Sequence, residues 1–477
     1  MTSLGGSRQQ PGMVHFVVPA SVEDPTNPSG GNVYDTTMAR HLPQYGWDVR
    51  MHPVPGGWPL PSEADRGRLA ELLQNLPTGS VVLIDGLVGC CVPEIIDTAA
   101  QRLTMVALVH MPLADEVGLD RVLAVDLQEA ERTMLRRCAG TVTTSHHIRH
   151  RICSTYNLTY QATTAAPPGT DRAPLATGSP GASRLLCVAA ITPTKNQMLL
   201  VQALEPLAHL PWTLRLVGPE RAPDYVAAVR DTATKAGLAE RITVTGPLAG
   251  EALAAEYANA DLALLPSVAE TYGMVIGEAL AAGLPVAATC TGGTYEALYS
   301  TSLGPPGRLL DPHDPAAWTE VLQQWLTDPA LRDELRAAAE ERRSTLPGWD
   351  ATASTVARAL DRACTPVTVY SLEDRTALAG TAATALRTLD PGDTIARITL
   401  AESLRGADIV PDLAYDRIPR STAAPGGLSR PAAPDPQGHL EYVLARLLQR
   451  LEAIPGYGDD LLSSYADDLD QFTGRQP

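Results

Sequence analysis

Features common in secreted, membrane and metal-dependent proteins are missing from this 477-residue sequence. No apolar run reaches the roughly 18 to 20 residues that a membrane-spanning helix needs. The polar first 13 residues lack the basic and apolar regions of a signal peptide. The seven cysteines are scattered without any C-x-x-C spacing, which favours neither a disulfide framework nor a zinc site. We therefore expect a soluble protein of the reducing cytoplasm.

Two phosphate-binding fingerprints are also missing. The sequence contains neither G-x-G-x-x-G nor G-x-x-x-x-G-K-S/T, so it has no dinucleotide fingerprint and no P-loop. A nicotinamide-dependent oxidoreductase needs such a fingerprint with a downstream acid for ribose, and is therefore disfavoured. Lysine is scarce too, because only Lys195 and Lys235 stand against 35 arginines. Each lysine therefore merits attention.

Positive charge is in short supply overall. The formal net charge of −17 and the pI near 5.0 disfavour a nonspecific hold on nucleic acid or on an anionic membrane surface. We expect no nucleic-acid partner and no membrane span, and leave a peripheral membrane contact open. The run HHIRHR at 146–151 could bind an acceptor phosphate or a membrane. At a helix start capped by Ser145, such a run is more often a solvated face.

Short β-branched runs alternate with helical stretches along most of the chain. The alternation fills residues 13–175, pauses in a proline- and glycine-rich connector at 165–184, and repeats over 182–347. It predicts an α/β protein with two Rossmann-like, doubly wound domains that face a central cleft across a flexible connector. Ligands of such sheets bind at the carboxyl ends of the strands.

The rest of the chain carries less information. Residues 348–364 are predicted to form a helix that packs back on the first domain. Residues 365–477 form an extension of unknown function that is partly linker-like, with one helix predicted at 439–454. Asp468 and Asp470 match the Asp-x-Asp spacing of metal-dependent transferases. No strand precedes them in this acidic tail, so a metal site there is disfavoured.

The densest chemical signal lies between residues 267 and 293. A loop carries Glu270, and an apolar helix predicted from about Gly273 to Gly283 contains Glu278. A carboxylate inside an apolar helix is costly without a hydrogen-bond partner. A fully helical span of eight residues would separate the two acids by about 12 Å. That separation is comparable to the reach of a nucleotide sugar from its hexose ring to its ribose.

Both carboxylates are good acceptors for pairs of sugar hydroxyls, and the backbone N–H groups around Tyr272 to Met274 open towards an anion. This arrangement favours a nucleotide-sugar site. The alternative is purely structural. In that case Glu270 is an exposed carboxylate favoured by the helix dipole, and Glu278 is paired with an internal arginine.

Two further candidates stand at predicted helix starts. Gly30 and Gly31, followed by Asn32, lie between the first strand and the first helix, where glycines let a phosphate approach the backbone. Lys195 follows a strand of the second domain and opens a helix. An ammonium there opposes the helix dipole, and a bound pyrophosphate would explain it better.

Two titratable residues end strands of the first domain. His110 follows MVALV at the edge that faces the expected cleft, and structural and catalytic roles are about equally open for it. Asp85 ends VVLID and could meet an acceptor hydroxyl.

In this order, these residues resemble the GT-B glycosyltransferases, and within them the large retaining glycosyltransferase family 4. The resemblance spans about residues 13 to 363 and includes GGN, VHMP, PPGTD, TPTK, and ETYGMVIGE followed by ALAAGLPV and TGG. The catalytic candidates that result are His110, Glu270 and Lys195. The donor-binding candidates are Gly30, Gly31, Asn32, Lys195, Tyr272, Gly273, Met274, Val275 and Glu278.

The resemblance implies transfer of a glycosyl group from a nucleotide sugar to a hydroxyl of a small molecule or glycan. It implies retained anomeric configuration, no covalent enzyme intermediate, and neither a metal nor another cofactor. One position departs from the family: an arginine usually precedes the lysine by five residues, and this sequence has Ala190. Either another arginine takes that role or leaving-group stabilisation is weaker. A second function therefore stays open, namely a nucleotide-sugar-binding protein with little or no activity.

Overall fold

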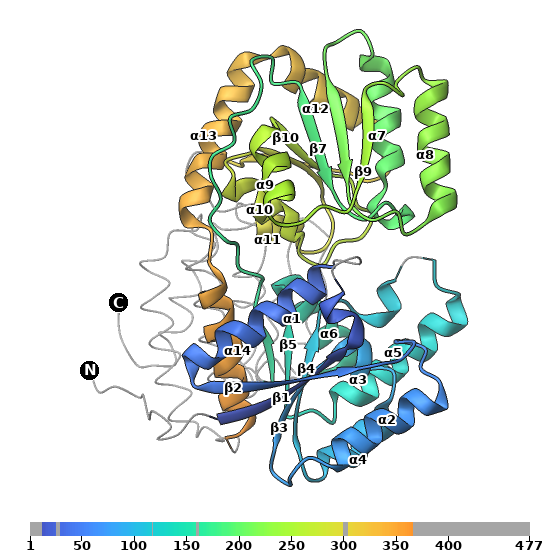
Figure 1. The fold of residues 1–477 in the computed structure, drawn as a ribbon, viewed down its shortest axis with the longest axis vertical. Coiled ribbons are helices and arrows are strands. Elements are labelled where there is room, and N and C mark those ends of the chain that lie inside the picture. The colour runs from blue at the N-terminus through green and yellow to red at the C-terminus, as the bar shows by residue number, and fades with distance from the viewer. Residues whose placement is uncertain (1–11, 25–28, 117, 159–161, 299–303, 366–477) are drawn as a thin grey trace, which may run out of the picture. The chain divides into compact units, whose positions relative to one another are not determined.

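The computed structural model covers most of the chain up to residue 365 (Figure 1). The residues that it describes are 12–24, 29–116, 118–158, 162–298 and 304–365. By their contacts, the described residues within Met1–Arg151 and Thr164–Cys364 belong to one compact unit. The helix predicted at 439–454 and the pair Asp468 and Asp470 lie outside the described residues.

The first sheet is parallel, as the alternation predicts, and has six strands. In spatial order its strands are β2 (Trp47–Val54), β1 (Gly12–Pro19), β3 (Val81–Asp85), β4 (Thr104–Val109), β5 (Gly140–Thr143) and β6 (Thr163–Ala165). All five residues of β3 and the last six of β1 are buried. Such continuous buried runs are typical of parallel strands covered on both faces.

The second sheet has the same construction. Its strands are β12 (Gly307–Leu310), β11 (Val286–Thr289), β10 (Leu262–Leu265), β7 (Arg184–Val188), β8 (Thr213–Val217) and β9 (Ile242–Gly246). Successive residues of β7 enter different cores, because side chains alternate across a strand. Leu185 and Cys187 join the cluster on one face, and Leu186 joins the cluster on the other.

Helices lie on both faces of each sheet (Figure 1). Around the first sheet they are α1 (Gly30–His41), α2 (Glu63–Gln74), α3 (Gly86–Gly89), α4 (Pro93–Ala100), α5 (Arg121–Leu135) and α6 (His146–Tyr156), with short turns η1 (Ala20–Glu23), η2 (Leu42–Tyr45) and η3 (Leu113–Asp115). Around the second they are α7 (Gln197–Leu204), α8 (Pro223–Lys235), α9 (Gly250–Asn259), α10 (Met274–Ala281), α11 (Thr294–Leu298), α12 (Pro315–Thr327) and α13 (Pro329–Thr345), with η4 (Pro193–Lys195) and η5 (Glu205–Leu207). None of the described helices combines the length and the apolar character needed to span a bilayer.

The last described helix, α14 (Trp349–Ala363), packs against the first sheet rather than the second. Its buried face carries Trp349, Val356 and Leu360 into the same core as Val14 and Phe16 of β1. The chain therefore returns to the first domain after it has completed the second.

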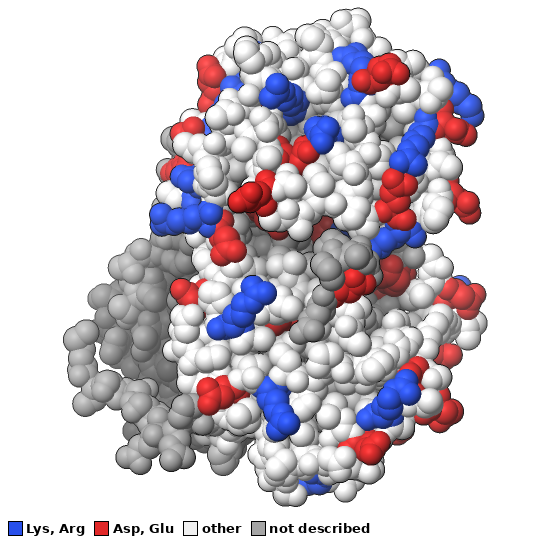
Figure 2. Space-filling model, in the orientation of Figure 1, with Lys and Arg blue, Asp and Glu red and all other residues white. Residues whose placement is uncertain are grey.

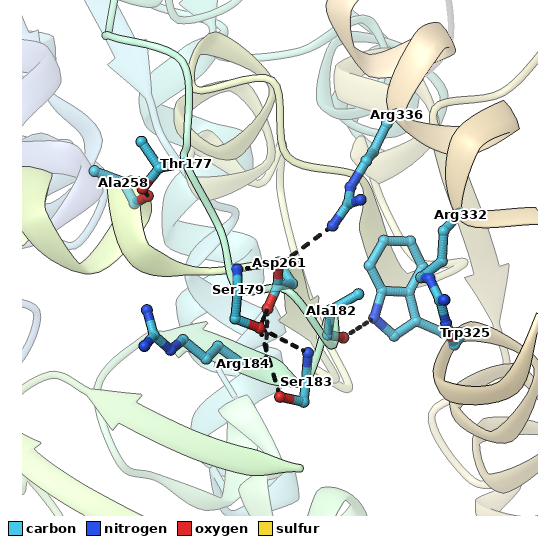
Figure 3. A network of polar contacts seen from close by, with 10 residues as sticks. All are labelled: Thr177, Ser179, Ala182, Ser183, Arg184, Ala258, Asp261, Trp325, Arg332 and Arg336. Atoms are coloured by element: carbon cyan, nitrogen blue, oxygen red, sulfur yellow. Dashed lines mark hydrogen bonds and ion pairs between the residues drawn. The ribbon is translucent and has the colours of Figure 1, made fainter. Parts of the chain in front are cut away.

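The connector between the two sheets is held by polar contacts, although its composition predicts a flexible segment. The buried carboxylate of Asp261 accepts hydrogen bonds from the backbone N–H of Ser179 at 2.8 Å, from the Ser179 hydroxyl at 2.6 Å and from the backbone N–H of Arg184 at 2.9 Å (Figure 3). The guanidinium of Arg336 pairs with the same carboxylate at 3.3 Å. One buried acid with several donors therefore fixes the end of a proline- and glycine-rich segment.

Charged side chains of both signs are interspersed on the face in Figure 2. On the described part of that face, lysines and arginines do not gather into one broad basic area.

Candidate active site

The predicted site residues lie at the carboxyl ends of strands in each sheet. His110 directly follows β4, and Asp85 is the last residue of β3. In the second sheet, the loop after β7 leads to Lys195 and the loop after β10 leads to Glu270. Because the strands of each sheet run parallel, these residues occupy the edge at which open α/β sheets bind ligands.

Three neighbours lie against the His110 imidazole, and a fourth holds its backbone. Its Nε2 lies 2.8 Å from Oδ1 of Asp35, a carboxylate on α1 whose side chain is fully buried. The Tyr34 ring meets the imidazole edge-on with centroids 5.3 Å apart, and the Thr144 hydroxyl donates to the His110 carbonyl at 3.1 Å. A Cβ on Gly31 would lie 3.4 Å from the imidazole carbon Cδ2, so this glycine lets α1 pass close to the ring.

Two buried carboxylates determine the charge of this group. Burial by itself would lower the pKa of His110, but the hydrogen-bonded Asp35 and the nearby Asp85 outweigh it and raise the pKa to about 9. Burial, together with the negative charge of Asp35, raises the pKa of Asp85 to about 7. Asp85 also accepts from the backbone N–H of Leu87 at 2.8 Å. At neutral pH His110 is therefore an imidazolium, and Asp85 beside it carries only part of a negative charge.

Asp35, Asp85 and His110 each place one ligand-type atom within 4.8 Å of the other two, and this is the one such cluster among the described residues. Asp85 is only 5% exposed and lies against Asp35. Its predicted contact with an acceptor hydroxyl stays a prediction.

Gly30, Gly31 and Asn32 form the first turn of α1. The Ser29 hydroxyl accepts from the Asn32 backbone N–H at 3.1 Å, and the Asn32 side-chain amide donates to the Ser21 carbonyl at 2.8 Å. Asn32 therefore fixes the loop before α1 through its backbone N–H and its side-chain amide. Its contact with a nucleotide-sugar donor stays a prediction. A Cβ on Gly30 would come within 3.3 Å of the Met274 sulfur, so this turn lies beside the start of α10.

Lys195 and Glu270 form an ion pair. The Lys195 Nζ lies 2.7 Å from Oε2 of Glu270, and the side chains are 28% and 13% exposed. From the sequence, Glu270 is expected either to interact with the helix dipole or to bind a ligand. In the structure its partner is the ammonium of Lys195. The two loops are also joined by their backbones, because the Val268 N–H donates to the Thr194 carbonyl at 2.9 Å. The pair therefore spans the carboxyl ends of β7 and β10.

The helix predicted from Lys195 starts later. Pro193–Lys195 form the short turn η4, capped by the Thr192 hydroxyl, and Asn196 takes a left-handed conformation at φ 54° before α7 begins at Gln197. Lys195 therefore precedes the helix proper. Glu270 already neutralises its charge, so the helix dipole alone does not require a bound pyrophosphate.

Glu278 on α10 is buried and paired with a tyrosine. The Tyr257 hydroxyl of α9 donates to Oε2 of Glu278 at 2.6 Å. The proposed internal arginine partner is therefore wrong. Burial raises the pKa of Glu278, the hydrogen bond from Tyr257 opposes that shift, and the negative charge of Asp171 adds to it. Asp171 belongs to the PPGTD segment, whose Thr170 hydroxyl would lie 2.4 Å from a Cβ on Gly277.

The start of α10 leaves backbone donors without side-chain caps. Gly273 precedes the helix at φ 88°, a left-handed conformation that favours glycine, and no side chain caps the first turn. The first N–H groups, including those of Met274 and Val275, are the kind of donors that bind anions. Tyr272 is 7% exposed and packs in the core beneath α10, where burial raises its pKa to about 12.

The TGG turn supports the loop that carries Glu270. Gly292 has φ 57°, and a Cβ there would lie 1.5 Å from the Glu270 carbonyl oxygen. A Cβ on Gly293 would lie 2.3 Å from the carbonyl of Thr271 and 3.1 Å from the Ser145 side chain. Only glycine allows the two backbones to approach so closely, and this contact fixes the loop that carries Glu270.

An acid from the second domain caps a helix of the first. Glu296 on α11 accepts from the backbone N–H groups of His146 at 2.8 Å and His147 at 2.6 Å, at the start of α6. Ser145 caps the same helix, as predicted, through Ile148 at 3.1 Å. Burial raises the pKa of Glu296 to about 7, although the two backbone donors lower it. The run at 146–151 therefore begins with two residues whose backbone donors are occupied.

Three residues that matter here were missed from the sequence. Glu296 follows the TGG motif by three residues and could have been found as an acid beside a glycine turn. Asp35 falls on the buried face of α1 with Tyr34 and Met38, so helical periodicity could have marked it as a buried acid. Tyr257 carries no local signal, because its partner is 21 residues away.

Residues 178–342 match the family model described as glycosyl transferases group 1. This match covers the second sheet with its helices. Over these residues the chain is similar to the group 1 glycosyl transferases, in agreement with the predicted resemblance to glycosyltransferase family 4.

Relatives with assigned names match only in part. A D-inositol 3-phosphate glycosyltransferase of Xylanimonas cellulosilytica is 37% identical over 163 residues, which are 34% of this chain and 37% of the relative. The enzyme of that name from Kineococcus radiotolerans is 33% identical over 244 residues, which are 45% of this chain and 55% of the relative. The chain thus spans between about a third and just over half of the length of these two relatives.

Solved structures share the whole two-sheet arrangement. A sucrose-phosphate synthase from Thermosynechococcus elongatus aligns with a TM-score of 0.60 at 19% identity, over 74% of this chain and 98% of that protein. HepE of Anabaena, solved in complex with UDP-glucose, aligns with a TM-score of 0.58 at 16% identity, over 73% and 99%. At such identities the likeness concerns the fold, and it confirms the predicted GT-B fold.

Proposed function

We propose that this chain transfers a glycosyl group from a nucleoside diphosphate sugar to a hydroxyl acceptor, with the anomeric configuration retained. The observation that carries the proposal is the set of charged groups around the start of α10. Glu270 precedes the helix, Glu278 lies within it, and the Lys195 ammonium lies 2.7 Å from Glu270. Glu270 suits the hydroxyls of a sugar, Lys195 suits a diphosphate, and Glu278 suits the hydroxyls of a ribose.

The donor is oriented by groups that the second domain fixes in place. Glu278 is held by the Tyr257 hydroxyl and accepts from the ribose hydroxyls with its remaining lone pairs. The uncapped N–H groups at the start of α10 and the Lys195 ammonium hold the diphosphate. Glu270 accepts from hydroxyls of the transferred sugar after its partner Lys195 turns to the phosphate.

The reaction breaks the bond between the anomeric carbon and the diphosphate oxygen, and forms a bond to the acceptor oxygen on the same face. The acceptor proton passes to an oxygen of the departing diphosphate. The negative charge on that group grows in the transition state, so Lys195, the helix amides and the His110 imidazolium lower the barrier. His110 stands beside the sugar and donates from the ring nitrogen that does not face Asp35.

We propose that the reaction needs no metal ion. The cations of Lys195 and His110 lie at the ends of their own strands and supply positive charge that a metal supplies elsewhere. The cluster of Asp35, Asp85 and His110 has a spacing that a metal could also use. In our proposal the proton on His110, rather than a metal ion, balances the negative charge of the two carboxylates. Turnover that persists in EDTA supports this view, and turnover restored only by Mg²⁺ or Mn²⁺ contradicts it.

Ala190 leaves one cation fewer than the resemblance implies. We expect slower departure of the diphosphate rather than loss of function, because Lys195, Glu270, Glu278 and His110 are in place. A binding protein without turnover is therefore the less favoured alternative. We also place the protein in the cytoplasm, since its cysteines are scattered without any C-x-x-C spacing, which fits a reducing compartment.

The first experiment is a thermal-shift screen with UDP, GDP, ADP and dTDP and their sugars, because a ligand that binds the native state raises the melting temperature. UDP-glucose comes first because HepE was solved with it, and D-inositol 3-phosphate is the first acceptor because relatives carry its name. Release of the nucleoside diphosphate is then measured with and without acceptor. Binding without any release, across all donors, would favour the binding protein.

A further inference from the structure

We propose that Asp35 is a positioning residue, which orients the His110 ring so that Nε2 faces the protein and Nδ1 faces the transferred sugar. The inference deepens the proposed function and rests on it. Nothing in the sequence motifs points to Asp35, because it lies in the middle of a helix and three residues beyond the GGN turn.

The contact geometry leaves the ring little freedom. Nε2 of His110 is 2.8 Å from a carboxylate whose side chain is fully buried, and Tyr34 and Gly31 pack against the ring. The Tyr34 hydroxyl is itself anchored on the Ala166 carbonyl at 2.9 Å. No described residue bonds to Nδ1, and 19% of the His110 side chain is exposed. One nitrogen is thus fixed and the other is left for a ligand.

Asp85 lies beside Asp35 and affects its charge. Its second oxygen, Oδ2, is buried and has no hydrogen-bond partner among the described residues. Asp85 lies within 4.8 Å, and burial raises its pKa to about 7, so near neutral pH a fraction of Asp85 carries a proton. A proton on Asp85 lowers the repulsion between the acids and leaves Asp35 as the charged acceptor for His110. The titratable groups that face the ring are Asp35 and Tyr34 from α1 and Asp85 from β3.

Asp35→Asn removes the charge with little change in volume. An asparagine oxygen can still accept from Nε2, but it no longer favours the protonated ring. We expect the pKa of His110 to fall from about 9 towards 6.5. Loss of an oriented charged donor at the reacting group typically lowers turnover, and we expect kcat to drop by roughly tenfold to a hundredfold at pH 8. The donor KM should change little, because Lys195 and Glu278 bind the donor elsewhere.

The chain offers a matched control in its second histidine–aspartate pair. His41 Nδ1 lies 2.9 Å from Asp350, and the side chains are 28% and 64% exposed. Asp350→Asn therefore changes the same chemistry at a more exposed pair that does not contact His110. We expect it to leave both kcat and the titration of His110 unchanged.

Two measurements on the full chain test the inference. Imidazole ¹⁵N shifts are followed between pH 5 and 10 in the wild type, Asp35→Asn and Asp350→Asn, with His110→Gln assigning the signal. Turnover is measured for Asp35→Asn, His110→Gln and the double variant. If Asp35 acts through His110, the double variant is no slower than His110→Gln alone.

The two measurements separate the possible failures. A wild-type His110 that titrates at or below 6.5 overturns the inference without any variant, even if Asp35→Asn does not fold. An equal loss of kcat from Asp35→Asn in the His110→Gln background also overturns it, because the role is then structural. If the wild type turns over no nucleotide sugar, the proposed function fails, and the titration alone decides whether Asp35 controls His110.

Discussion

We expect Lys195 to leave Glu270 and pair with a phosphate when the donor binds. The ammonium that we assign to the donor phosphates is bound to Glu270 at 2.7 Å in this structure. A phosphate must therefore displace Glu270 before it can pair with Lys195. Glu270→Gln removes the competing charge and keeps the size of the side chain. We expect this variant to lose glycosyl transfer and yet bind a nucleoside diphosphate more tightly than the wild type does.

The exposure of the two side chains sets the size of the effect. With Lys195 28% and Glu270 13% exposed, the pair is partly shielded from water. A hydrogen bond between charged groups contributes about 1.5 to 3 kcal/mol, and screening of these partly exposed groups reduces it to about 1 to 2 kcal/mol. Since about 1.4 kcal/mol is a tenfold change in affinity, the Kd should fall by roughly five- to thirtyfold.

Isothermal titration calorimetry measures this change directly. The titrant is the nucleoside diphosphate that raises the melting temperature most, tested on the wild type, Glu270→Gln and Lys195→Met. Glu256→Gln is the matched control, because Glu256 is 14% exposed and forms an ion pair of the same kind with Arg215 at 2.5 Å. It should leave the Kd unchanged.

Two results of the calorimetry would contradict this expectation. If Glu270→Gln weakens nucleotide binding as much as Lys195→Met does, Glu270 contacts the nucleotide itself and the exchange of partners is wrong. If all variants bind alike, Lys195 does not reach the phosphates.

Three further perturbations follow from the contacts. Tyr257→Phe leaves the buried Glu278 carboxylate without its donor, so nucleotide affinity measured by calorimetry should fall about tenfold, while an unchanged Kd would remove Glu278 from the ribose site. Ala190→Arg should raise kcat in a diphosphate-release assay, and an equal rate would show that another cation already serves. Glu296 has a pKa raised to about 7 in the folded state against 4.5, so the native state binds more protons than the unfolded state between these values. The free energy of unfolding should therefore fall by up to about 3 kcal/mol as pH rises from 4.5 to 7, and urea titrations of Glu296→Gln should show a flatter dependence than those of the wild type.

The fold was predictable because its signal is local. Short β-branched runs that alternate with helical stretches predict parallel strands, and both sheets contain strands whose residues are all buried, such as β3 and β10. The acids before and within α10 were also predictable, since an apolar helix with one carboxylate and a glycine at each end is visible in the sequence itself. Local patterns therefore located the strand ends and the residues at them.

The partners of those residues were not predictable, because they depend on contacts across long stretches of chain. The structural alternative paired Glu278 with an arginine, but its partner is the hydroxyl of Tyr257 on another helix. His110 was located, but its hydrogen-bond partner Asp35 lies 75 residues away. Composition misled in the connector, where Asp261 binds backbone and side-chain donors of a segment that looks flexible.

The most direct test of the account is a ¹H NMR time course of the protein with an α-configured nucleotide sugar and an acceptor, in EDTA. We predict that the anomeric proton signal of the donor decays while an α-linked product and free nucleoside diphosphate appear together. A β-linked first product would contradict retention. A donor signal that stays constant for every nucleotide sugar that the protein binds would contradict the proposed transferase activity.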